Sequence, residues 1–401
     1  MKNKNIIYLS YDGMTDSLGE SQVLSYLKEI SKSHSVNLVS FEKKENSNKV
    51  SRIKQITENH NINWKFFYYT KKPPVISTLF DLFRMYFYVK KNIDLSKINL
   101  IHSRSYFASL VALIIKNKFH VPFIFDMRGW MIDENLERKS WTGFFYKPVV
   151  KVLRKLELKY ISQSDVIISL TQISKEILIN KYSSNPAKIF VIPTCVETEK
   201  FYFDEKSRLK IRNNYNIKED DFLLIYTGSI GGYYNIDEML LFFKELLIHQ
   251  TSSKFLFLTQ QSENIIYKSA DVNGIDKSLI IVDKTTFDKV FEYLSAADAG
   301  LVLYDDSFSS TGRSPTKLAE YWSCGLRAFA PKDLGDLNFY FDNLELGSQF
   351  KGFNKTSYRI CINNFFNNSY TREEVMSKLP INFNYRTGSS NYLKIYEKFY
   401  N

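Results

Sequence analysis

The residues best placed for chemistry lie in the segment 314–325, which reads SPTKLAEYWSCG. It follows a strand-like run and a polar loop, and its composition predicts a helix. Free N–H groups at the start of a helix attract phosphate, as does the helix dipole. Lys317 puts a cation in the first turn, where a bare helix prefers anions, so a phosphate beside it would explain its presence. Glu320, one turn later, could accept hydrogen bonds from sugar hydroxyls.

The alternative for this segment is an ordinary capped surface helix. Ser314 or Thr316 would then be the N-cap, and Glu320 would complete a capping box. The sequence of this segment alone leaves both interpretations open.

Other polar loops follow predicted strands. Gly228-Ser229, with two further glycines close behind, permits a close approach of backbone to phosphate, although the spacing is not that of a dinucleotide fingerprint. Asp12-Gly13, and Asp126 with Arg128, also come directly after strands, at the sheet edge where open α/β folds bind ligands. A flexible loop at Gly228 and a buried Asp126–Arg128 pair are the structural alternatives.

The elements that must position these residues alternate between short apolar runs and helical periods. This alternation predicts parallel, doubly wound sheets. Strands are expected at Ile6–Ser10, Ser35–Phe41, Ile98–His102, Pro122–Asp126, Asp165–Leu170, Lys188–Ile192, Phe222–Gly228, Phe255–Thr259, Leu279–Val282 and Ala299–Tyr304. The pattern restarts after residue 200, so we expect one Rossmann-like domain over 1–195, a second over 196–384, and a terminal helix within 385–401 that packs back toward the first.

Composition narrows the possible functions. The 401 residues include three cysteines, too few for a disulfide scaffold and typical of a reducing compartment. No signal peptide or spanning segment is evident, which predicts a cytoplasmic protein. The net charge of +11 is uneven: residues 1–200 hold 31 Lys/Arg against 18 Asp/Glu, and residues 201–401 hold 23 against 25. A basic first half suits an anionic membrane or a nucleic acid.

Five segments together resemble glycosyltransferase family 4, whose members are retaining enzymes of the GT-B fold. Residues 314–325 resemble its donor-nucleotide motif. The others, in chain order, are residues 11–24, similar to the acceptor loop, 125–134, similar to a segment lining the interdomain cleft, 191–201, similar to the linker, and 226–234, similar to the loop that opens the donor domain. The resemblance implies two Rossmann-like domains facing across a cleft.

The resemblance also implies roles for individual residues. It places Asp126, Arg128, Lys317 and Glu320 at the reacting centre. It assigns the donor to Gly228, Ser229, Arg313, Ser314, Pro315, Thr316, Lys317 and Glu320, and the acceptor to Asp12, Gly13, Gly19, Gln22, Arg104, Asp133 and Glu134. The chain departs from the family at Gly312, where many members carry a glutamate, and after Gly228, where many carry an Arg and a Lys. Arg313 and Lys317 are the expected replacements.

Two segments interleave basic and aromatic residues. Residues 79–91 are apolar nearly all round, which favours a core helix. Residues 138–159 suit contact with an anionic lipid surface, because basic side chains stand beside aromatic rings. The residues expected at the lipid are Trp141, Phe144, Phe145, Lys147, Lys151, Arg154 and Lys155.

The expected function is therefore transfer of a sugar, with retention, from a nucleotide sugar. By resemblance the donor is a UDP-sugar, no metal or other cofactor takes part, and the acceptor is a lipid-linked or saccharide chain of a surface polysaccharide. The enzyme would attach peripherally to the inner face of the cell membrane. A GT-B sugar-nucleotide epimerase is the alternative. A nucleic-acid-binding protein is disfavoured, since no recognition module is evident.

Overall fold

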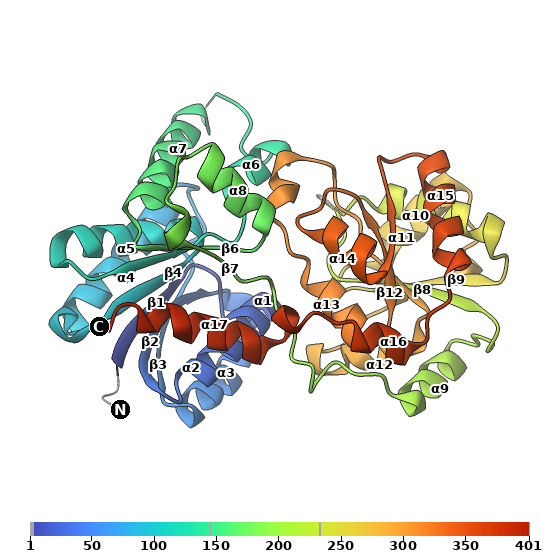
Figure 1. The fold of residues 1–401 in the computed structure, drawn as a ribbon, viewed down its shortest axis with the longest axis horizontal. Coiled ribbons are helices and arrows are strands. Elements are labelled where there is room, and N and C mark those ends of the chain that lie inside the picture. Colours follow the sequence, from blue (N-terminus) through green and yellow to red (C-terminus); the bar gives the residue numbers. More distant parts are fainter. Residues whose placement is uncertain (1–3, 145, 232–233, 401) are drawn as a thin grey trace. The chain divides into compact units, whose positions relative to one another are not determined.

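The computed structural model describes residues 4–144, 146–231 and 234–400 (Figure 1). The chain divides into two compact units. The N-terminal unit comprises Met1–Cys195 with Asn384–Asn401, and the C-terminal unit comprises Val196–Phe383.

The N-terminal unit is built on a seven-stranded parallel sheet in the order β3-β2-β1-β4-β5-β6-β7. Its central strands are short apolar runs buried on both faces, as covered parallel sheets require. The strands are β1 (Lys4–Ser10), β2 (His34–Glu42), β3 (Ile62–Tyr68), β4 (Leu100–Arg104), β5 (Phe123–Asp126), β6 (Val166–Ser169) and β7 (Ile189–Val191). The strand order reverses direction between β1 and β4, so crossover helices cover both faces.

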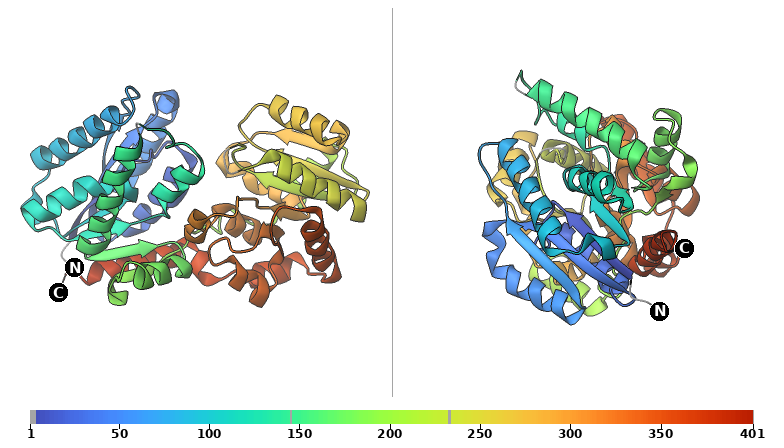
Figure 2. Two further views of the ribbon diagram at one scale, coloured as in Figure 1. Left: turned by 90° about the horizontal axis from the view of Figure 1, so that it is seen from above. Right: turned by 90° about the vertical axis from the view of Figure 1, so that its left-hand side faces the viewer.

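One helical layer of this unit contains α4 (Ile76–Asn92), α5 (Ser105–Phe119) and α7 (Tyr146–Gln163), and α5 contacts both of the others (Figure 2). The remaining α-helices of this unit are α1 (Ser17–Gly19), α2 (Ser25–Ile30), α3 (Ser47–Asn59), α6 (Met131–Glu137), α8 (Gln172–Asn180) and α17 (Tyr385–Glu397). The terminal helix α17 packs on α2, and its Tyr392, Ile395 and Tyr396 join the apolar core of this unit.

The C-terminal unit carries a six-stranded parallel sheet in the order β10-β9-β8-β11-β12-β13. The strands are β8 (Phe222–Thr227), β9 (Ser253–Leu258), β10 (Ile280–Asp283), β11 (Ala299–Leu301), β12 (Arg327–Pro331) and β13 (Gly347–Phe350). The helices are α9 (Glu205–Asn214), α10 (Ile236–His249), α11 (Glu263–Asn273), α12 (Val290–Ala296), α13 (Thr316–Ser323), α14 (Leu337–Leu344), α15 (Lys355–Asn367) and α16 (Arg372–Ser377). The predicted fold class, two doubly wound parallel sheets, is confirmed.

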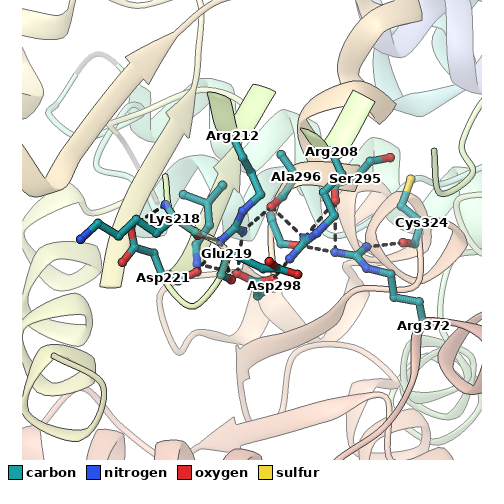
Figure 3. Close-up of polar contacts among 12 residues, drawn as sticks. Arg208, Arg212, Lys218, Glu219, Asp221, Ser295, Ala296, Asp298, Cys324 and Arg372 are labelled. Carbon is teal, nitrogen blue, oxygen red and sulfur yellow. Dashed lines mark hydrogen bonds and ion pairs between the residues drawn. The ribbon is translucent and has the colours of Figure 1, made fainter. Parts of the chain in front are cut away.

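Three arginines link the helices α9, α12, α13 and α16 of this unit (Figure 3). Arg208 and Arg212 of α9 share the carboxylate of Asp298 and donate to backbone carbonyls at the end of α12. Arg372 of α16 donates to the Cys324 carbonyl, 2.8 Å away, just past the end of α13. Cations at these positions satisfy carbonyl groups that helix ends leave without intrahelical partners. The cluster is therefore structural, and it fixes the C-terminal end of α13.

Candidate active site

In the C-terminal unit the strand order reverses between β8 and β11, and several site residues follow these two strands. Gly228 and Ser229 come directly after β8, and Tyr304 comes shortly after β11. The chain then passes through a 3-10 turn, Phe308–Gly312, and enters α13 at Thr316. Ligands of open α/β sheets bind at such a reversal, outside the carboxyl ends of the strands.

Lys317 lies at the centre of this site, inside a cage of three tyrosine rings. Its Nζ is 4.1 Å from the ring centroid of Tyr226, 4.7 Å from that of Tyr234 and 5.8 Å from that of Tyr304. The Nζ is shielded from solvent and has no hydrogen-bond partner among the described residues. Burying an ammonium without an anionic partner is costly, which makes the cage a candidate site for an anion.

The protonation behaviour of Lys317 and Glu320 reflects this burial. Burial lowers the pKa of Lys317 to about 7, although the charge of Glu320 works against that fall. Burial raises the pKa of Glu320 to about 7, again opposed by the charge of its neighbour. A negative charge beside an amine stabilises its protonated form. An anionic ligand at Lys317 would therefore raise the pKa of Lys317 again and restore the charged ammonium.

The N-cap position of α13 is taken by a proline. Its N-cap residue is Pro315, which has no hydroxyl, and no side-chain cap hydrogen bond is formed there. The alternative of a capping box from Ser314 or Thr316 with Glu320 is therefore wrong. The positive end of the helix dipole at this N-terminus favours phosphate.

Other residues predicted at the donor site have these positions and contacts. Gly228 has a φ of +120°, a conformation that favours glycine, and a Cβ there would lie 3.5 Å from the Lys317 Nζ. Ser229 is exposed, and its carbonyl accepts the Tyr226 hydroxyl at 2.6 Å. The Arg313 guanidinium stacks over the Tyr304 ring, 5.2 Å from its centroid, and donates to the Ser309 hydroxyl at 2.8 Å.

In the N-terminal unit the predicted site residue Asp126 is the last residue of β5, and Arg128 follows two residues later. An Arg128 Nη atom lies 3.9 Å from the Asp126 carboxylate, and both side chains are buried. Burial opposes ionisation of Asp126, but the Arg128 charge and the contact with His102 outweigh it and lower its pKa. Arg128 has a φ of +56°, in the left-handed region that non-glycine residues rarely occupy. The structure thus holds a buried acid–base pair on a strained backbone at the strand end.

Behind Asp126 a buried hydrogen-bond chain leads to the terminal helix. His102 Nε2 lies 3.4 Å from the Asp126 carboxylate, and His102 Nδ1 lies 2.6 Å from the Tyr396 hydroxyl. Burial lowers the pKa of His102, so the imidazole is neutral at pH 7. The neutral ring donates from Nε2 to the ionised Asp126 and accepts the Tyr396 hydroxyl at Nδ1.

The predicted acceptor loop is shaped by two glycines and a buried acid. Glu42, at the end of β2, accepts hydrogen bonds from the backbone N–H groups of Met14 and Thr15 at 2.8 and 2.9 Å. A Cβ on Gly13 would lie 2.7 Å from this carboxylate, and one on Gly19 would lie 2.0 Å from the Gly13 carbonyl oxygen. In this conformation of the loop, only glycine fits at both positions.

Other residues expected at the acceptor are engaged inside the protein. Arg104 Nε donates to Asp12 at 3.1 Å, and Arg104 is buried. Gln22 is also buried, and its amide donates to the Cys195 carbonyl at 2.8 Å. These contacts give Arg104 and Gln22 structural duties, whereas Asp12 keeps about half of its side chain exposed.

The segment expected at the membrane divides in two. Arg154 is half-buried and pairs with Asp133 at 2.8 Å and with Glu157 at 3.0 Å, so it is an internal ion-pair partner. Asp133 is thereby occupied as well, and Glu134 lies 3.8 Å from Arg138. The exposed members are Phe144, Lys147, Lys151 and Lys155, while Trp141 is half-buried and Phe145 lies outside the described residues.

Sequence reasoning missed the tyrosine cage and Glu42. Tyr226 lies in β8, Tyr234 lies in the loop after β8, and Tyr304 follows β11. Their positions near the ends of two neighbouring strands were the feature of the sequence that could have indicated the cage. A hollow of about 770 Å³ elsewhere in the C-terminal unit, between β13, α14 and α15, contains none of the predicted site residues. Within the described part of the chain, no three His, Cys, Asp or Glu side chains are grouped closely enough to hold a metal ion.

The Glycosyltransferase Family 4 model matches residues 20–200. This range lies almost entirely in the N-terminal unit and includes Asp126 and Arg128. No curated protein sequence gives a significant match to the chain.

Solved structures share the fold along the whole chain. Sucrose-phosphate synthase from Thermosynechococcus elongatus has a TM-score of 0.75 and 13% identity over 99% of both chains. A glycosyltransferase from Rickettsia africae has a TM-score of 0.71 and 14% identity over 100% of this chain and 99% of its own. Anabaena Alr3699/HepE, solved with UDP and glucose, has a TM-score of 0.69 and 12% identity over 97% and 98%. Such identities show the GT-B fold alone. Together with the family match they support a glycosyltransferase similar to family 4.

Proposed function

We propose that this protein is a retaining glycosyltransferase that moves a hexose or N-acetylhexosamine from a UDP-sugar to a lipid-linked or saccharide acceptor. The proposal is carried by the caged Lys317 at the start of α13, whose Nζ has no hydrogen-bond partner among the described residues. A nucleoside diphosphate supplies the anion that this ammonium lacks, and its phosphates fit the positive end of the helix. The UDP found with the Anabaena structure favours a uridine nucleotide.

In this proposal the protein acts mainly by electrostatics. As the bond from the sugar to the β-phosphate breaks, negative charge grows on the departing diphosphate, and Lys317 with the α13 amides stabilises it. The leaving phosphate accepts the proton of the incoming hydroxyl, so no separate base is needed. Glu320 contacts hydroxyls of the donor, and the backbone at Gly228 leaves room for the phosphates. In the N-terminal unit the proposed catalytic residues are Asp126 and Arg128, and no metal takes part in the proposed reaction.

We further propose that the acceptor belongs to a surface polysaccharide and that the enzyme works at the inner face of the cell membrane. Within the described residues, no helix has the length and hydropathy needed to cross a bilayer. The exposed lysines 147, 151 and 155 recur at one helical turn on α7, which favours contact with an anionic surface.

The test is a screen of UDP- and GDP-sugars for binding and for slow hydrolysis by the purified protein. We expect one UDP-sugar to be hydrolysed, with the anomeric configuration of the released sugar retained. Glu320→Gln and Lys317→Met should abolish this turnover, and the exposed Lys268→Met, also in the C-terminal unit, should not. Inversion at the anomeric carbon, or full activity in both site variants, would contradict the proposal. Conversion of the donor into its epimer would identify an epimerase instead.

A further inference from the structure

The helix α4 has two apolar faces, and only one of them is covered. The covered face contains Leu82, Met85 and Val89, which are buried against the rest of the N-terminal unit. The other face consists of Ile76, Leu79, Phe80, Phe83 and Phe87, all exposed, with Ile76 64% and Phe83 58% accessible. The expectation that residues 79–91 form a core helix is therefore wrong for half of its circumference.

The exposed residues form a single continuous stripe. Their spacing of three or four residues keeps them on one side of the helix over nearly three turns. All five side chains are solvent-exposed, whereas the opposite face of α4 packs within the unit, where α4 contacts α5. Scattered single apolar side chains are normal on a protein surface, but five on one helical face mark an interaction site.

Exposed lysines stand at both ends of the stripe, and one of them, Lys71, pairs with the exposed Glu45. Lys71 and Lys72 are exposed just before the helix, and Lys90 and Lys91 are exposed in its last turn. The one acidic residue of α4 is Asp81, and it is buried. An apolar stripe between basic ends is the pattern of a helix that lies in the interface of an anionic bilayer.

We infer that this stripe of α4 inserts into the headgroup region of an anionic membrane. The inference rests on the proposed function at a membrane surface. It assigns the apolar contact with the lipid to α4, whereas the sequence analysis expected that contact in residues 138–159. The exposed lysines 147, 151 and 155 of α7, in the same helical layer, then supply long-range attraction. A second copy of the chain fits less well, because a two-fold pairing through the stripe would bring one copy's Lys90 and Lys91 toward the other's Lys71 and Lys72.

The contact places the membrane next to the acceptor loop. Asp81, on the covered side of α4, accepts a hydrogen bond from the Tyr11 hydroxyl at 3.2 Å and from the Thr70 backbone N–H at 2.9 Å. Tyr11 immediately precedes Asp12 and Gly13. A lipid-linked acceptor anchored in the bilayer under α4 would therefore present its saccharide near this loop.

The experiment measures partition of the full-length protein onto vesicles. Vesicles of phosphatidylcholine with phosphatidylglycerol are compared with vesicles of phosphatidylcholine alone. We expect the triple variant Phe80→Ser, Phe83→Ser and Phe87→Ser to lose about tenfold in partition for each phenylalanine replaced. Phe339→Ser is the matched control, since Phe339 is 60% exposed on α14 of the C-terminal unit. Its partition should equal that of the wild type.

A tryptophan reporter locates the insertion. Phe83→Trp should show fluorescence that shifts to the blue on vesicle addition and is quenched by brominated lipid, whereas Phe339→Trp should show neither. Unchanged partition of the triple variant, or equal binding to neutral vesicles, would overturn the inference. A wild-type dimer that the triple variant abolishes would also overturn it and assign the stripe to self-association.

The outcomes separate this inference from the proposed enzymatic function. The phenylalanines are exposed, so the triple variant should keep the wild-type melting temperature and UDP affinity. If no nucleotide sugar is hydrolysed but vesicle binding depends on the stripe, the enzymatic proposal fails and the membrane contact stands. If hydrolysis occurs and the stripe does not affect vesicle binding, the reverse holds.

Discussion

Replacing Lys317 with methionine should make the ligand-free protein more stable and unable to bind its nucleotide. A fall in pKa from 10.5 to about 7 means that the folded environment disfavours the ammonium by about 5 kcal/mol relative to water. Because Lys317 is already half neutral at pH 7, about 4 kcal/mol of this cost is felt there. Methionine has a similar length and carries no charge, so it removes the cost.

Two losses reduce the expected gain. The cation–π contacts with the cage tyrosines contribute roughly 0.5–2 kcal/mol. Glu320 loses its nearest positive charge, which raises its pKa further. We therefore expect Lys317→Met to raise the free energy of unfolding by about 1–3 kcal/mol, within the range found when buried ionic groups are replaced by apolar ones. For a unit of this size that corresponds to a rise of several degrees in melting temperature.

The assay combines calorimetric unfolding with UDP titration. UDP should raise the melting temperature of the wild type through linkage and leave Lys317→Met unchanged. Lys268→Met, an exposed lysine of the same unit, should alter neither quantity. A variant that unfolds at a lower temperature than the wild type, or that still gains stability from UDP, would refute the argument that the cage holds an unpaired cation for a diphosphate.

Three further predictions follow from the same geometry. Affinity for a UDP-sugar should be full below pH 7 and fall by up to about tenfold per pH unit above it, because binding needs the protonated Lys317; titration calorimetry should show a flat profile for Lys317→Arg. Gly19→Ala should lower the free energy of unfolding by about 1–3 kcal/mol despite the better helix propensity of alanine, since its Cβ would strike the Gly13 carbonyl, and a stabilised variant in denaturant unfolding would contradict this. Tyr396→Phe should cost about 1–2 kcal/mol in the same assay, because His102 Nδ1 loses its buried donor, and an unchanged midpoint would argue against the chain to Asp126.

The sheets were predictable where their strands are short apolar runs between polar loops. Strands β1, β2, β5 and β8 match their expected ranges closely, because burial on both faces demands continuous hydrophobic sequence. Strand β12 was missed because it begins with Arg327 and ends with proline, and β13 because GSQF carries little apolar signal. Arg327 is tolerated in a buried strand since its guanidinium donates to the Phe365 carbonyl at 2.9 Å.

The sequence predicts where the proposed site lies but not its detail. The phosphate-binding role proposed for residues 314–320 follows from local properties, namely a helix start and a cation in its first turn. The cage around Lys317 does not, because the sheet topology is needed to bring Tyr304, which follows β11, beside Tyr226 and Tyr234 of the segment 226–234. Likewise, the sequence of α4 is apolar nearly all round, so it does not indicate which face is buried. The elements that pack against α4 decide which face stays exposed.

The uneven charge of the chain now has a structural interpretation. A nucleotide site of this kind needs one buried cation and the amides of one helix, so a C-terminal half with no net positive charge is no obstacle to a diphosphate. The basic excess of the first half includes Lys90 and Lys91 on α4 and the exposed lysines of α7, in one helical layer of the N-terminal unit. Basic residues that only attract a soluble anion need no exposed apolar side chains beside them. Here it borders a stripe of exposed phenylalanines, and that combination selects a lipid surface over a soluble polyanion.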